Sequence, residues 1–239
     1  MRQDGRENNQ LRQISIYKDF IKNADASVLY CQGDTKVICT ATVDESVPPF
    51  LVDTGKGWVT AEYSMLPRAT NTRNNRDISR LKLSPRSTEI QRLIGRSLRG
   101  AVDLNLLKER SIIIDCDVIN ADGSTRCASI TGGFIALRLA VNNLLKQNIL
   151  KQDPIIKSVA AVSVGIIDNK PMLDLCYIED SSAQTDMNFV MTSNGGFIEI
   201  QGTAEGQELE KEQLDLMIEL AKDGTKLLFK EQKRVLSEI

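Results

Sequence analysis

The chain has 239 residues, a formal net charge of −2, five cysteines and no histidine. Its hydrophobic share of 41% and charged share of 26% are ordinary for a globular protein that is long enough to bury a full core. The absence of histidine excludes nucleophilic mechanisms with an imidazole base and metal sites with imidazole ligands. Because the net charge is negative, any affinity for nucleic acid must come from a local basic patch.

The cysteines indicate a reducing compartment. They lie inside apolar patterns without a C-x-x-C pair, so we expect free thiols and a cytoplasmic protein. The N-terminal M-R-Q-D-G-R has no signal-peptide core, and no apolar run looks long enough to span a bilayer. We therefore expect no membrane association.

The first third of the chain reads as a set of strands. Runs of apolar and β-branched residues predict them at 11–20, 26–31, 37–43 and 58–63, with a hairpin turn at 32–34.

A strongly basic segment follows at 68–99. Its nine arginines and lysines face only Asp77 and Glu89, a local charge of +7. The first half, which lacks an apolar period, predicts a mobile basic loop. The second half predicts a helix with Thr88 and Gln91 in capping-box register and Gly100 just past its end. Its polar face carries Arg92, Arg96 and Arg99, which would meet either RNA or a neighbouring subunit.

The stretch 112–131 combines a strand, a turn and a helix. Ile112 to Ile119 predicts a buried strand, Asp122-Gly123 predicts a turn, and Ser124 and Thr125 are good helix caps. This arrangement points backbone N–H groups, two hydroxyls and the Arg126 guanidinium at one place, so it predicts an oxyanion site, most simply for phosphate. An ordinary turn with a serine cap is the alternative.

The second half of the chain broadly repeats the first after Asp153-Pro154. A hairpin is expected at 158–167 and 172–178, a polar loop at 179–186, and strands at 187–192 and 197–201. Two helices are expected to close the chain, one at 207–222 and one after Gly224. Strands mixed with helices predict an α/β (α+β) fold in a single domain, 1–239, with similar halves at about 1–152 and 153–239.

Two carboxylates in the polar loop, Asp180 and Asp186, are either solvated turn residues or ligands for a hard divalent cation. Beside an anion site and an arginine patch, the pair favours metal-assisted phosphoryl transfer.

Seven ordered motifs resemble the bacterial ribonuclease PH family, the phosphorolytic tRNA nucleotidyltransferases, along nearly the whole chain. They are R-Q-D-G-R at 2–6, G-D-T-K-V-I-C-T-A at 33–41, G-W-V-T-A-E-Y-S-M-L-P-R-A-T at 57–70, E-I-Q-R-L-I-G-R-S-L-R at 89–99, A-D-G-S-T-R-C-A-S-I-T-G at 121–132, E-D-S-S-A-Q-T-D-M-N at 179–188 and I-E-I-Q-G-T-A-E-G at 198–206.

The resemblance implies a phosphate-dependent 3′ exoribonuclease that trims tRNA 3′ trailers or ribosomal RNA ends, releases nucleoside 5′-diphosphates and can run in reverse. It also implies a duplicated βαβα unit like the second domain of ribosomal protein S5, assembled as a homohexameric ring of three dimers. Ser124 departs from the glycine that the family usually has there. The resemblance implies these site residues: phosphate held by Arg86, Ser124, Thr125 and Arg126; Mg²⁺ or Mn²⁺ and catalysis at Asp180 and Asp186; RNA on Arg68, Arg73 and Arg76.

Two other functions remain open at this stage. One is a catalytically silent, RNA-binding subunit of an exosome-like ring, which typically lacks the acidic pair or the phosphate-site arginines that this chain keeps. The other is a small-molecule kinase on a related fold, which would need a longer glycine-rich loop and a lysine than G-S-T-R provides.

Overall fold

The computed structural model describes residues 2, 4–76, 84–205 and 208–237. Asp77, Arg80 and Lys82 of the basic segment lie outside the described residues.

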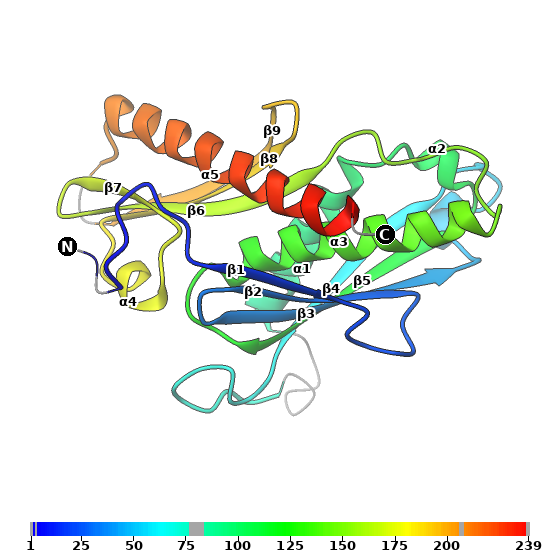
Figure 1. The fold of residues 1–239 in the computed structure, drawn as a ribbon, viewed down its shortest axis with the longest axis horizontal. Coiled ribbons are helices and arrows are strands. Elements are labelled where there is room, and N and C mark those ends of the chain that lie inside the picture. Colours follow the sequence, from blue (N-terminus) through cyan, green and yellow to red (C-terminus); the bar gives the residue numbers. More distant parts are fainter. Residues whose placement is uncertain (1, 3, 77–83, 206–207, 238–239) are drawn as a thin grey trace.

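A five-stranded sheet forms the first half of the molecule (Figure 1). Its strand order is β1-β2-β3-β5-β4, and only β4 and β5 are parallel, because α1 (Pro85–Arg99) crosses over between them. Alternate side chains of these strands are buried against helices on one face of the sheet. The strands are Ile14–Lys18 (β1), Ala26–Gln32 (β2), Thr35–Asp44 (β3), Trp58–Met65 (β4) and Ser111–Asn120 (β5).

A four-stranded antiparallel sheet with the order β7-β6-β8-β9 forms the second half. Its strands are Val159–Ile167 (β6), Lys170–Leu173 (β7), Thr185–Thr192 (β8) and Phe197–Ala204 (β9). Three short helices, Pro49–Leu51, α2 (Leu104–Leu107) and α4 (Tyr177–Asp180), lie in connections.

The helix α3 (Thr125–Lys146) lies between the two sheets and is apolar on nearly all sides, as a helix covered all round must be. The long helix α5 (Lys211–Ser237) covers the other face of the second sheet, where Ala160, Val162 and Val164 pack on Met217 and Leu228. Because both faces of β6 are covered, nearly all of its residues are buried. The predicted α/β (α+β) class is confirmed.

Three local predictions are wrong. The helix α1 begins at Pro85, and its cap is not Thr88 but Ser84, whose hydroxyl accepts a hydrogen bond from Ser87 N–H. The strand expected to run to residue 178 ends at Leu173. The chain ends in one helix rather than two, because Gly224 lies inside α5, where a Cβ would come within 2.8 Å of the Leu173 side chain. Gly224 therefore permits close packing and does not end the helix.

The expectation that no segment could span a bilayer also needs correction. By length and composition α3 passes that test among the described helices, but 72% of its apolar window is buried inside the protein, as in the core helix of a globular fold.

Candidate active site

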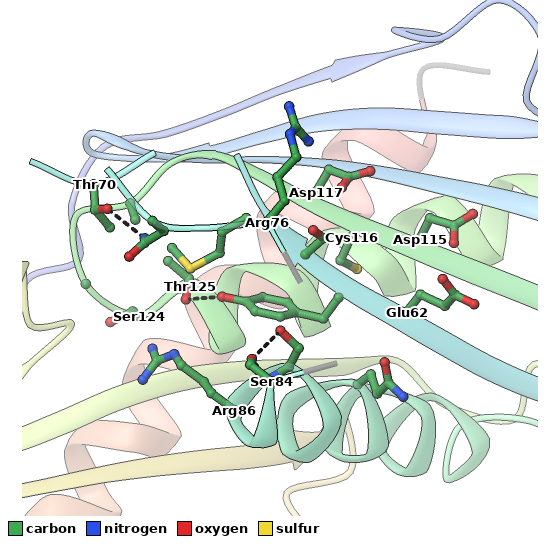
Figure 2. A pocket seen from close by; sticks show the side chains of 18 of the residues that line it. Glu62, Thr70, Arg76, Ser84, Arg86, Asp115, Cys116, Asp117, Ser124 and Thr125 are labelled. Atoms are coloured by element: carbon green, nitrogen blue, oxygen red, sulfur yellow. Dashed lines mark hydrogen bonds between the residues drawn. The ribbon is translucent and has the colours of Figure 1, made fainter. Parts of the chain in front are cut away.

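A cleft of about 710 Å³ lies where the first turns of α1 and α3, the helix α4 and the loop after β4 meet. Figure 2 shows Arg86, Ser124 and Thr125 around one part of it. Asp180 also lines this cleft. The structure thus brings together predicted residues that are almost a hundred positions apart in the sequence.

The predicted turn before α3 is present, and it is fixed against α4. Gly123 has φ +75°, and a Cβ there would lie 2.5 Å from the Leu175 carbonyl oxygen, so only glycine fits. The Asp122 carboxylate accepts a hydrogen bond of 3.1 Å from the Tyr177 N–H at the start of α4. The turn that precedes the α3 N-terminus and the helix that ends in Asp180 therefore form one unit.

The hydroxyls of the turn are used differently from the prediction of a helix cap. Ser124, at φ 55°, makes no side-chain cap to the described helix α3, and its hydroxyl instead bonds Ser163 Oγ at 2.6 Å and the Leu175 carbonyl. The Thr125 hydroxyl is 2.8 Å from the buried Tyr63 hydroxyl. With no side-chain cap, the N–H groups in the first turn of α3 are the anion-binding groups that the turn offers.

Two arginines add positive charge to this helix terminus. Arg86 lies in the first turn of α1, exposed toward the cleft. Arg126 lies in the first turn of α3 and is oriented by Glu89, at 3.0 Å from Nη1, and by Gln201. Glu89 lies three positions after Arg86 and so on the same face of α1. This spacing could have identified Glu89 from the sequence as a residue near the site.

The acidic pair lies beside these arginines, although not in the loop where it was expected. Asp180 is the last residue of α4, and Asp186 is the second residue of β8. Burial raises the pKa of Asp180, and Arg86 and Arg126 oppose the rise. Burial, followed by the charge of Asp180, raises the pKa of Asp186 to about 6 against the same two arginines. The charges of Arg86 and Arg126 therefore stabilise the ionised form of both carboxylates, and the charge of Asp180 destabilises that of Asp186.

The pair suits a hard divalent cation. Asp186 Oδ1 is buried and has no hydrogen-bond partner among the described residues, which is costly unless a cation or proton accompanies it. No group of three or more metal-ligating side chains occurs in the described ranges. Mg²⁺ typically needs only one or two carboxylates, because it keeps water and binds substrate phosphates.

A buried ion-pair network, which the sequence did not predict, holds the residues next to the site in place. Arg2 forms a two-pronged contact of 2.7 Å with Glu179, the residue before Asp180. Arg12 pairs with the buried Asp174 at 2.7 Å and also donates to the Asp122 carbonyl of the turn. The N-terminal R-Q-D-G-R motif, which had no assigned role, was the available signal for Arg2.

The predicted RNA-binding arginines fall into two groups. The first group, on the exposed loop beside the cleft, is Arg68, Arg73 and Arg76, and Arg76 lines the cleft itself. The start of this loop is joined to the turn before α3, because the Ala121 N–H donates to the Ala69 carbonyl.

The second group lies along α1, outside the cleft. Arg96 pairs with Glu199 at 2.9 Å, and Arg99 stacks 4.3 Å over the Trp58 ring. Arg92 is exposed next to them, in a separate cavity.

The mixed fold and a cleft that joins an anion site to Asp180, with Asp186 beside it, define a candidate phosphoryl-transfer protein. Comparison with known families identifies which family of proteins this is. The model of the 3′ exoribonuclease family, domain 1, matches residues 10–141, and that of domain 2 matches residues 157–224. The chain therefore belongs to the 3′ exoribonuclease, or ribonuclease PH, family.

Solved structures share the fold. The crystal structure of rice (Oryza sativa) Rrp46 is 17% identical, with a TM-score of 0.80 over 98% of this chain and 100% of that chain. The Archaeoglobus fulgidus exosome with RNA bound to the active site is 22% identical, with a TM-score of 0.78 over 96% of this chain and 92% of that one. An archaeal exosome core is also 22% identical, with a TM-score of 0.75 over 96% and 90%.

Proposed function

We propose that this protein is a phosphorolytic 3′ exoribonuclease that acts within a ring of related subunits. One observation carries the proposal: Arg86, the α3 N-terminus and Asp180 line one cleft, and Arg126 and the half-buried Asp186 lie close enough for their charges to act on this group. Anion-binding groups beside a carboxylate pair are what the transfer of a nucleotidyl group from RNA to inorganic phosphate needs.

Inorganic phosphate is the nucleophile. Arg86 and the turn at residues 123–126 would bind it and hold one oxygen in line with the last phosphodiester of the RNA. The new P–O bond forms as the bond to the 3′ oxygen of the preceding nucleotide breaks. The proton of hydrogen phosphate ends on that 3′ oxygen, and the products are a nucleoside 5′-diphosphate and an RNA one nucleotide shorter. No histidine is needed, because no water has to be deprotonated.

Asp180 and Asp186 would hold Mg²⁺ or Mn²⁺. Such an ion, when bound, neutralises negative charge that develops on the reacting phosphoryl group. Arg126, oriented by Glu89 and Gln201, adds a fixed positive charge on the same side.

A catalytically silent subunit of an exosome-like ring is the competing function. The named structural neighbours are exosome proteins, and they support this alternative better than a bacterial tRNA-processing enzyme. The chemistry of the cleft supports catalysis, because a silent subunit has no need to keep a destabilising carboxylate pair beside an anion site.

The test is to incubate the protein with a 3′-extended tRNA and with an unrelated single-stranded RNA, with and without inorganic phosphate. We expect nucleoside diphosphates only with phosphate; binding of RNA without any product would establish the silent subunit. Comparison of the two RNAs tests whether tRNA 3′ ends are the substrate, as the family resemblance implies, and mass measurement of the native particle tests the homohexamer against a mixed ring.

A further inference from the structure

The Asp186 carboxylate has a polar neighbour on its own strand. Asn188 lies two positions along β8 and so points to the same face of the strand, where its side-chain amide lowers the pKa of the Asp186 carboxyl against the larger effect of burial. Oδ1 is buried without a hydrogen-bond partner among the described residues. A buried carboxylate oxygen that has no hydrogen-bond partner and lies near another carboxylate indicates a cation-binding position.

A buried thiol sets the orientation of Asn188. Cys127 of α3 donates to Asn188 Oδ1 across 3.1 Å, and the two residues are only 2% and 8% exposed. Burial raises the pKa of the Cys127 thiol far above neutrality, so the sulfur keeps its proton and can donate it. Because the amide oxygen accepts from the thiol, the NH₂ group of Asn188 is left to donate, and the Asp186 carboxylate is an acceptor on the same face of β8.

We propose that Cys127 and Asn188 are positioning residues that fix the Asp186 carboxylate with Oδ1 directed at a divalent cation. This inference rests on the proposed function, since it concerns the same acidic pair. The opposite amide orientation is disfavoured twice. It would direct the Asn188 oxygen at an anionic carboxylate, and it would leave the Cys127 thiol without its acceptor. The α3 helix thereby supplies both the phosphate-binding turn and, through its Cys127 side chain, the alignment of the acidic residue on β8.

The alternative is an ordinary core hydrogen bond with no effect on the carboxylate. A matched pair of variants separates the two. Cys127→Ser and Cys127→Ala both lose the volume of the sulfur, but only serine keeps a donor for the Asn188 oxygen. Cys31→Ala, at a buried thiol of β2, controls for the loss of a core sulfur elsewhere.

The primary readout is Mn²⁺ binding to the protein without RNA or phosphate, measured by electron paramagnetic resonance. We expect Cys127→Ser and Cys31→Ala to bind within about threefold of wild type, and Cys127→Ala about tenfold more weakly. Asn188→Leu, which removes the donor to Asp186, should weaken binding by about 10- to 100-fold. RNA affinity should stay near wild type in all four variants.

Equal Mn²⁺ affinities for Cys127→Ser and Cys127→Ala would overturn the positioning role, whatever their melting temperatures. Absence of Mn²⁺ binding by the wild-type protein would overturn it too. If the serine–alanine difference appears but the wild-type protein releases no nucleoside diphosphate, the proposed function fails and the positioning role stands.

Discussion

Replacement of Asp186 by Asn should stabilise the protein while it removes the activity. The ordinary pKa of 3.8 rises to about 6 in the folded protein, mainly through burial and then through the charge of Asp180. A rise of that size corresponds to about 3 kcal/mol by which the ionised group disfavours folding at neutral pH. Because Asp186 is only half-buried, screening should reduce the effect to roughly 1–2 kcal/mol.

The sign of the pH dependence follows from the raised pKa. A carboxyl that is harder to ionise in the folded state contributes stability when it is protonated, and this contribution is lost as the pH rises from about 4 through about 6. Asp186→Asn removes this loss. We therefore expect its melting temperature to exceed that of wild type by roughly 3–6 °C at pH 7.5, and to match it near pH 4.

Differential scanning calorimetry of both proteins between pH 4 and 8 is the assay. Addition of Mg²⁺ should raise the wild-type melting temperature and leave that of Asp186→Asn nearly unchanged, because the cation binds the folded site. A melting temperature for Asp186→Asn that is unchanged at pH 7.5, or raised equally at pH 4 and 7.5, would contradict the destabilised carboxylate.

Three further predictions concern activity and RNA binding. Asp180→Asn should lower kcat by at least about 100-fold in both directions of the reaction, because one transition state serves both, and RNA binding should be retained. Rates within a few-fold of wild type at saturating phosphate and Mg²⁺ would remove Asp180 from the active site. Arg86→Ala and Arg126→Ala should each lose roughly 2–4 kcal/mol of transition-state stabilisation and raise the phosphate concentration needed for half-maximal rate; an unchanged phosphate dependence in both would refute the phosphate site. RNA affinity should fall steeply with salt, and the double variant Arg68→Ala, Arg73→Ala should flatten that slope in filter-binding titrations, whereas an unchanged slope would exclude this loop from the RNA path.

Much of the fold is predictable from local patterns. The alternation in β3 and β5 and the apolar stripe of α1 specify strands and a helix, because each pattern matches one period of the backbone. Gly224 misled the prediction because a glycine that permits close packing looks the same in sequence as one that ends a helix.

The candidate site was predicted in composition but not in arrangement. Asp186 read as a loop residue because a half-buried carboxylate at the start of a strand breaks the apolar alternation that marks strands. Ser124 read as a cap, but tertiary contacts with Ser163 and Leu175 engage its hydroxyl. The Arg2–Glu179 contact joins residues 177 positions apart, and no local pattern reveals such a pair.

The source of the terminal phosphate in the released nucleotide tests the central claim most directly. The protein is incubated with unlabelled RNA and ³²P-labelled inorganic phosphate, and the released nucleotides are separated and treated to remove the terminal phosphate. Attack by phosphate predicts nucleoside diphosphates whose label lies entirely in the β-phosphate, with no label in the shortened RNA. Unlabelled nucleoside monophosphates as the product would contradict phosphorolysis.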